Sequence, residues 1–304
     1  LGSRGLGDVY KRQFWNKPYY TAAVTVGKLL RYTMVHDFVA GDYMWTGIDY
    51  LGEANWPQRS AGCGCLDTCG FEKDAFYFYK SVWNQNEKFA YLCPHWNLKL
   101  EKGTVLPVIC YTNCEDAELF VNGRSFGMKS KGFPCYGMTE RYGHFDRYRR
   151  PANTDDLFLS WDVPYEPGKI EVVGYHDGKE VCRYNVETTG EAAAIKLTVD
   201  KTSVDADGRS VVQAEVRILD SEGHLVFDAC PELNFTLEGD GEIIGIDNGD
   251  PACHEQWKET KGRHAFNGMA YAVIRAGQNK GELKLTVTSS DNTLTNASVT
   301  IQVG

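Results

Sequence analysis

The chain has 304 residues, of which 42% are hydrophobic and 12% aromatic, a composition that fits a globular protein and excludes a disordered or collagen-like one. Its 32 Lys and Arg against 41 Asp and Glu give a net charge of −9, so nucleic acid is not an expected partner. No apolar run reaches the roughly 18 residues of a membrane span, and the length predicts two or three folding units.

Residues 1–13, LGSRGLGDVYKRQ, are rich in Gly and Arg and show no periodicity. They resemble translated read-through of a sequencing adapter, and we interpret them as a non-native leader outside the fold. They lack the apolar centre of a signal peptide. Because the start looks truncated, this does not bear on the compartment of the parent protein.

The next segment has the order helix, strand, long loop, helix. Apolar residues recur every three or four positions over 21–38, which predicts an amphipathic helix. The stretch 41–52, GDYMWTGIDYLG, is aromatic and nearly continuously apolar, as buried strands are. A polar loop leads to a second predicted helix over 74–83 that begins at an acidic residue. This is the repeating unit of an α/β fold, and it opens without a preceding strand, so the fold is expected to be incomplete.

Ten cysteines are present, three of them in the cluster CGCLDTC at 63–69. The spacing in this cluster is not CxxC, and no second Cys or His pair follows at finger-like distance. We therefore expect free thiols, with no metal and no cofactor. Free thiols favour a reducing interior, while a periplasmic or secreted location and the oligomeric state stay open.

After residue 94 the pattern changes to short alternating strands joined by turn dipeptides. Three stretches are typical of β-hairpin strands: 105–113, 118–127 and 169–186. The Asn-Gly pair at 122 and the Asp-Gly pair at 177 supply tight turns. A pause at 187–193 precedes a second series of about seven strands, the pattern of an immunoglobulin-like sandwich.

The block from 41 to 83, GDYMWTGIDYLGEANWPQRSAGCGCLDTCGFEKDAFYFYKSVW, resembles the final βα unit of the barrel in glycoside hydrolase family 2. The likeness continues through PHWNLKL, ELFVNGRSFG, LSWDVPYEPGKIEVVGYHDGK and IIGIDNGDP, which resemble the modules that follow the barrel in bacterial members usually labelled β-galactosidases. The resemblance implies a mixed fold. The C-terminal end of a (β/α)8 TIM barrel would occupy 14–98, followed by two all-β immunoglobulin-like sandwich domains over 99–189 and 190–304.

For function, the resemblance implies retaining hydrolysis of a terminal β-linked galactoside by two Glu carboxyl groups about 5 Å apart. The family places both on earlier barrel strands, so this chain is expected to lack them and to be inactive alone. The expected partners are a β-linked galactoside or oligosaccharide and the missing N-terminal part of the same chain. A β-glucuronidase or β-mannosidase is the enzymatic alternative, and a carbohydrate-binding or adhesive β-sandwich module is the alternative from another class.

Five residues are expected to bind substrate: Trp45, Asp49, Glu53, Trp56 and Arg59. Trp45 matches the aromatic residue that the family places on the floor of the sugar site, with filling of the barrel core as the alternative. Asp49 and Glu53 are expected to bind a sugar hydroxyl or to brace the loop through Arg59, not to act as the catalytic pair. Trp56 and Arg59 either line outer subsites or pack the loop.

We expect two further polar clusters to have no role in binding or catalysis. The arginines at 141, 147, 149 and 150 lie in a loop-like insert over 128–151 and are expected to face water. Asp247, Asn248, Asp250 and His254 could surround Ca²⁺, but turn-forming residues explain them without a metal, so a structural loop is expected.

Overall fold

The computed structural model describes residues 27, 30, 33–34, 38–41, 43–130, 157–258 and 261–304. The helix predicted over 21–38 lies mostly outside these residues, although Gly27, Leu30, Thr33 and Met34 are helical. The arginine cluster at 141–150 lies outside them entirely. Within the described ranges, no helix is long and apolar enough to cross a membrane.

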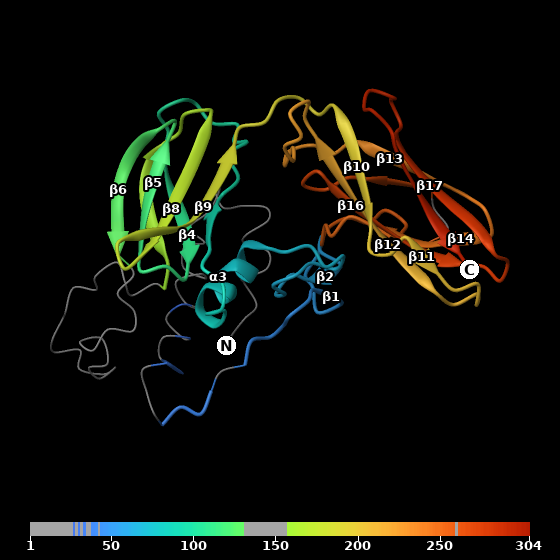
Figure 1. The fold of residues 1–304 in the computed structure, drawn as a ribbon, viewed down its shortest axis with the longest axis horizontal. Coiled ribbons are helices and arrows are strands. Elements are labelled where there is room, and N and C mark those ends of the chain that lie inside the picture. Colours follow the sequence, from blue (N-terminus) through green and yellow to red (C-terminus); the bar gives the residue numbers. More distant parts are fainter. Residues whose placement is uncertain are drawn as a thin grey trace. The chain divides into compact units, whose positions relative to one another are not determined.

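The chain divides into two compact units, and β-strands make up most of the regular secondary structure described in each (Figure 1). The first contains Leu1–Ala54, Ser60–Asp67 and Phe71–Thr188. The second contains Asn55–Arg59, Thr68–Gly70 and Thr189–Gly304. Two short pieces of the loop after residue 54 therefore belong to the second unit, although most of that unit lies more than a hundred residues further along the chain.

The first unit holds a sandwich of two antiparallel sheets. One sheet has the order β3 (Ala90–Cys93), β4 (Val105–Thr112), β7 (Leu159–Pro164). The other has the order β6 (Arg124–Ser130), β5 (Asp116–Val121), β8 (Lys169–His176), β9 (Lys179–Glu187). The two predicted turns are present, with left-handed φ of 49° at both Asn122 and Asp177. The sandwich begins with β3, before residue 99, the start predicted from the sequence.

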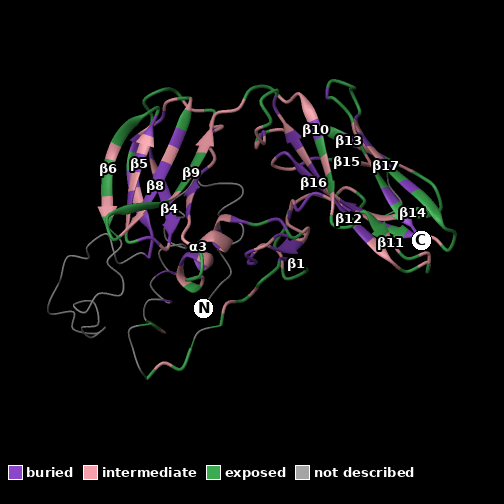
Figure 2. Ribbon diagram, viewed as in Figure 1, coloured by how far each residue is buried: buried purple, intermediate pink, exposed green. Residues whose placement is uncertain are grey.

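Strand β4 is buried on both faces, which explains its nearly continuous apolar sequence VLPVICYT (Figure 2). Leu106, Val108 and Cys110 point into the core between the two sheets. Their neighbours Ile109 and Tyr111 point the other way and join the cluster formed with helix α3 (Asp74–Trp83). The helix predicted over 74–83 is confirmed, and it packs on the outer face of this sheet.

The second unit is also a sandwich of two sheets. The first has the order β10 (Ala194–Val199), β12 (Val211–Leu219), β16 (Met269–Ala276), β14 (Gly241–Asp247). The second has the order β11 (Ser203–Val204), β18 (Ala297–Val303), β17 (Gly281–Ser289), β13 (Glu232–Glu238), β15 (Gly262–His264). Strand β12 alternates strictly, and its inward residues Val212, Ala214, Val216 and Ile218 are fully buried.

The continuous strand predicted over 41–52 is wrong for the part that the structure describes. Only β1 (Tyr50–Leu51) is a strand, paired with β2 (Ser60–Ala61), and a bridge joins Ile48 to Leu66. A buried parallel strand needs hydrogen-bonding neighbours on both sides. Among the described residues, this segment has backbone partners from Thr46 to Gly52, and the described residues just before Thr46 are not in a strand.

Candidate functional site

The segment 45–53, which contains three of the five predicted site residues, is held in place by the backbone of the loop that follows it. The amide of Asp49 donates to the carbonyl of Leu66 at 2.9 Å, and the amide of Leu66 donates to the carbonyl of Gly47 at 3.0 Å. A Cβ at Gly64 would lie 2.3 Å from the Asp49 nitrogen. Glycine is therefore required at 64, because only its bare backbone permits this close approach.

Asp49 is buried in an ion pair with Lys73, and both side chains are 2% exposed. One carboxylate oxygen of Asp49 accepts hydrogen bonds from Lys73 Nζ at 2.6 Å and from the amide of Gly64 at 2.7 Å. Burial raises the pKa of Asp49, and the neighbouring ammonium opposes that rise. The ion pair therefore joins the segment just before β1 to the start of α3.

Trp45, Tyr50 and Glu53 form an exposed hydrogen-bonded row. The indole Nε1–H of Trp45 donates to the Tyr50 hydroxyl at 3.0 Å, and that hydroxyl donates to the Glu53 carboxylate. The carboxylate raises the pKa of Tyr50, because it accepts a hydrogen bond from the protonated phenol. Trp45 is 61% exposed, so its single polar atom is satisfied while its ring stays open to solvent.

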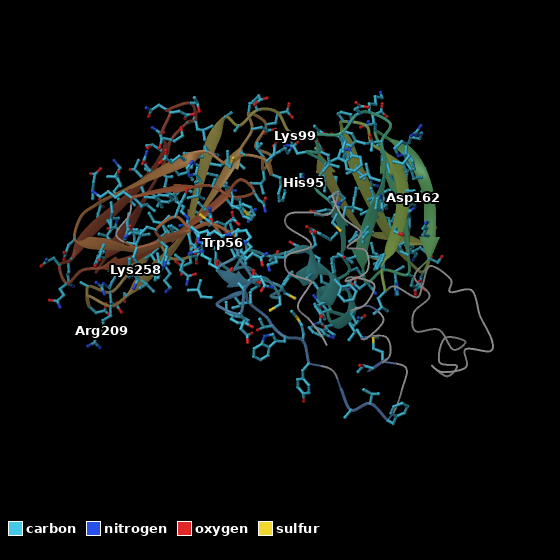
Figure 3. The ribbon with its side chains drawn as sticks, turned by 180° about the vertical axis from the view of Figure 1, so that it is seen from behind. Trp56, His95, Lys99, Asp162, Arg209 and Lys258 are labelled. Atoms are coloured by element: carbon cyan, nitrogen blue, oxygen red, sulfur yellow. The ribbon has the colours of Figure 1, made fainter. Side chains whose placement is uncertain are left out.

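Trp56, which is labelled in Figure 3, and Arg59 belong to the second unit and contact its loop after β14. The Trp56 ring stacks on His254 with centroids 4.9 Å apart and 30° between the planes. Arg59 Nη2 donates to both carboxylate oxygens of Asp247, at 2.8 and 2.9 Å. The sequence left open that Asp49 or Glu53 braces the loop through Arg59, but in the structure Arg59 pairs with Asp247.

The polar loop at 247–254 is built from contacts within the protein. Asp247 also accepts a hydrogen bond from Arg263, whose side chain is fully buried. Asn248 Oδ1 accepts a hydrogen bond from the amide of Asp250 at 3.0 Å, and Asn248 Nδ2 donates one to the carbonyl of His264 at 2.9 Å. The carboxylate of Asp250 accepts the amide of Ala252 at 2.9 Å. These are the side-chain-to-backbone bonds of a structural loop.

The structure thus sorts the five predicted residues into three groups. Trp45 and Glu53 share one exposed hydrogen-bonded row, Asp49 is buried with Lys73, and Trp56 and Arg59 lie against the 247–254 loop. Sequence reasoning missed Tyr50 and Lys73. Lys73 could have been found, since an acid in an apolar stretch calls for a basic partner nearby.

The cysteines described in the loop and the first sandwich fill apolar space. Cys63 and Cys65 are buried free thiols, and burial raises the pKa of Cys65 to about 12. Cys114 and Cys182 are also free thiols, with their sulfurs 3.4 Å apart. The buried thiols of Cys63 and Cys65 act as small hydrophobic groups, whereas Cys114 and Cys182 share a hydrogen bond.

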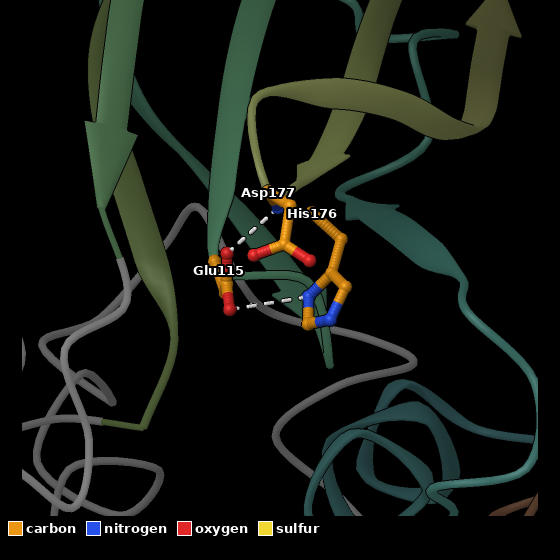
Figure 4. Close-up of side chains that lie close together, drawn as sticks. All are labelled: Glu115, His176 and Asp177. Carbon is orange, nitrogen blue, oxygen red and sulfur yellow. Dashed lines mark hydrogen bonds and ion pairs between the residues drawn. The ribbon is translucent and has the colours of Figure 1, made fainter.

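Glu115, His176 and Asp177 gather at one end of the first sandwich, with ligand-type atoms within 4.8 Å of one another (Figure 4). Glu115 accepts the amide of Asp177 at 3.0 Å and lies 3.3 Å from His176 Nδ1. His176 and Glu115 are 39% and 52% exposed. The group braces the turn at 177–178, and that role accounts for its contacts.

Comparison with known proteins assigns the chain to a family. The profile of the glycoside hydrolase family 2 C-terminal domain 5 matches residues 195–300, and that of a domain of unknown function, DUF4982, matches 103–182. The chain is 38% identical over 258 residues to beta-galactosidase BoGH2A of Bacteroides ovatus. It is 30% identical over 274 residues to a putative beta-glucuronidase of Formosa agariphila. The matches cover 84% and 88% of this chain but only 27% and 25% of those relatives.

Solved structures agree. A beta-glycosidase from Bacteroides vulgatus superposes with a TM-score of 0.78 at 31% identity, covering 91% of this chain and 32% of that one. A glycosyl hydrolase family 2 member from Bacteroides cellulosilyticus superposes with a TM-score of 0.79 at 26% identity, covering 93% and 38%. The chain therefore belongs to glycoside hydrolase family 2 and contains a C-terminal domain of that family.

Proposed function

We propose that this chain is the C-terminal portion of a retaining glycosidase that cleaves terminal β-galactosides, and that it supplies sugar-contacting residues but neither catalytic Glu. The observation that carries the proposal is the exposed indole of Trp45, whose N–H is already bonded to Tyr50. An aromatic ring fixed by its one polar atom is suited to stack on the apolar face of a pyranose. The proposed barrel end, predicted over 14–98 and cut short by β3 of the first sandwich at Ala90, would carry this ring.

The neighbours of Trp45 suit sugar hydroxyls. The Glu53 carboxylate can accept several hydrogen bonds, and the hydroxyl of Tyr50 can both donate and accept. Asp49, by contrast, has its contacts inside the protein. We therefore assign hydroxyl binding to Glu53 and Tyr50, and keep Asp49 as the group that fixes the strand beneath them.

A neutral sugar fits this segment better than a uronic acid. The only Lys and Arg between residues 43 and 73 are Arg59 and Lys73, and each is paired with a carboxylate. Recognition of a glucuronate carboxylate calls for an available cation, and Glu53 would repel it. This favours a galactoside over the β-glucuronide named for the relative from Formosa agariphila.

The test is to restore the upstream coding sequence and to assay the full-length protein on aryl β-galactoside, β-glucuronide and β-mannoside. We expect turnover of the galactoside with the greatest kcat/KM. The chain as given should turn over none of them, because one barrel strand cannot supply both an acid/base and a nucleophile. Turnover by this chain, abolished by Glu53→Gln, would overturn the assignment. Glycan binding by residues 86–304 alone, which keep β3, with an inactive full-length protein, would favour a binding module instead.

A further inference from the structure

The segment 55–59 is fastened to the loop after β14 by several independent contacts. His254 Nε2 bonds the carbonyl of Pro57 at 2.7 Å, and the amide of Arg59 donates to the carbonyl of Pro251 at 2.7 Å. Because a carbonyl can only accept, the bond to Pro57 places the His254 proton on Nε2. The backbone on both sides of residue 58 is therefore fixed to the second unit.

An ion cluster strengthens this attachment. The carboxylate of Asp247 accepts from Arg59 and from the fully buried Arg263. Arg263 is held in turn by the carbonyl of Glu255, to which its Nη1 donates at 2.8 Å. A buried guanidinium of this kind holds its geometry, since moving it would leave charge without a partner. We call Arg59, Asp247 and Arg263 the arginine clamp.

The clamp holds in place an aromatic side chain that contributes little to the core. Trp56 is 83% exposed, one face of its ring lies on His254, and the opposite face is left to solvent. Trp257, in the same unit, is less accessible than Trp56: it is 42% exposed, and the ammonium of Lys258 lies over its ring at 4.7 Å. A large apolar ring that is exposed and yet fixed is typical of a binding surface.

We propose that Trp56 and His254 form a platform that binds a neutral sugar ring, and that the second sandwich serves the enzyme by holding this platform through the arginine clamp. The inference rests on the proposed function for its ligand class. It makes Arg59 a positioning residue and not a residue that lines a subsite, because its guanidinium is occupied by Asp247. A neutral ligand is indicated because each arginine of the clamp already faces a carboxylate: Arg59 that of Asp247, and Arg263 those of Asp247 and Glu255.

The experiment uses the chain as given, labelled with 5-fluorotryptophan, and follows its ¹⁹F NMR spectrum during titration with lactose up to the solubility limit. Trp56→Phe assigns the Trp56 signal, and Trp257→Phe provides the matched control signal in the same unit. We expect the Trp56 signal to shift saturably, and the Trp257 signal to stay unchanged. A Trp56 signal that ignores lactose would overturn the platform.

Variants separate ligand contact from positioning. His254→Ala should weaken lactose binding roughly 2- to 10-fold by removing the stacked ring, and His254→Phe should restore it. Arg59→Lys keeps the charge but changes the donor geometry, so it should move the Trp56 signal before any sugar is added. Unchanged spectra and affinity in His254→Ala and Arg59→Lys would show that the clamp positions nothing. A response of the Trp45 signal without one from Trp56 would reject the platform and leave the proposed function standing.

Discussion

Asp49 and Glu53 show how two acids four residues apart come to play different parts. Asp49 is 6% exposed and shares its carboxylate with an ammonium and a backbone amide, whereas Glu53 is exposed and accepts from a tyrosine. The acid that is buried and paired contributes to structure, and the acid that faces water is available to a ligand. Spacing in the sequence could not separate them, because the partner that decides the matter, Lys73, is 24 residues away from Asp49.

Lys73→Met should lower the free energy of unfolding by about 3–5 kcal/mol, because it leaves the Asp49 carboxylate buried without its counter-ion. Urea unfolding measures the loss, and faster hydrogen exchange at the Gly64 amide, which bonds Asp49, shows that it begins at this site. The matched control is Glu53→Gln, which should change stability by no more than about 0.5 kcal/mol. Equal effects of the two variants would contradict a structural role for Asp49.

Trp45→Ala in the restored full-length enzyme should reduce kcat/KM roughly 5- to 150-fold, corresponding to the loss of a stacking contact of about 1–3 kcal/mol. In the chain as given, the same change should leave the melting temperature nearly unaltered, since the ring is 61% exposed. Steady-state kinetics and thermal unfolding are measured together. A lowered melting temperature with normal activity of the folded fraction would make Trp45 a packing residue.

Individual elements could be predicted where their own residues decide them. The helix over 74–83 and the turns at Asn122-Gly123 and Asp177-Gly178 follow from local periodicity and backbone preference, and the structure contains all three. The extent of the strand over 41–52 could not be predicted, because a strand forms only where a neighbouring strand pairs with it, and the described residues pair with this segment only from Thr46 to Gly52. Local signals cannot report a missing partner.

A thiol pair between two elements gives a prediction about pH. Cys114, just before β5, and Cys182, in β9, have sulfurs 3.4 Å apart. The hydrogen bond from Cys182 lowers the pKa of Cys114 to about 6, although burial opposes this, and it raises the pKa of Cys182. Alkylation of Cys114 requires its thiolate, so its rate should rise as pH increases through about 6 and then level off.

Peptide mass spectrometry after iodoacetamide treatment across a pH series measures this midpoint. Cys182→Ala should move the Cys114 midpoint upward towards an ordinary thiol value, because the donated hydrogen bond is gone. Cys65, whose pKa burial raises to about 12, serves as the unreactive internal control. A Cys114 midpoint that does not move in the variant would refute the shared hydrogen bond.

At the scale of the whole molecule, the sequence predicted two β-rich modules and an α/β remnant before them. In the structure, α3 and β3 belong to the same compact unit as the first sandwich. Helix α3 packs on the outer face of β4 in the first sandwich, and β3 is part of that sandwich. The contact from Arg59 to Asp247 joins residues 188 positions apart. No local pattern encodes either association, because both depend on which surfaces meet after each element has formed.

Truncation tests this arrangement. A chain that begins at residue 100 loses β3 and Trp96, which is fully buried, and exposes Ile109 and Tyr111 by removing α3. It should be less stable than a chain that begins at 71, by roughly 3–5 kcal/mol for the loss of Trp96 alone. Calorimetry of the two chains decides, and a chain that begins at 86, keeping β3 without α3, should fall between them. Equal melting temperatures would mean that α3 and β3 add nothing to the sandwich.

The division of the loop after residue 54 between two units bears on how such enzymes exchange parts. A recombination event that replaces everything after residue 188 with the module of another family member would replace Asp247 but keep the old 55–59 segment with Arg59. Arg59 would then lack its carboxylate partner unless the other family member also has an acid at the position of Asp247. Chimeras joined after residue 188 should therefore fold most often when Asn55–Arg59 is taken from the same parent as the second unit. The contact between these two segments, and not their order in the chain, then decides which parts must be exchanged together.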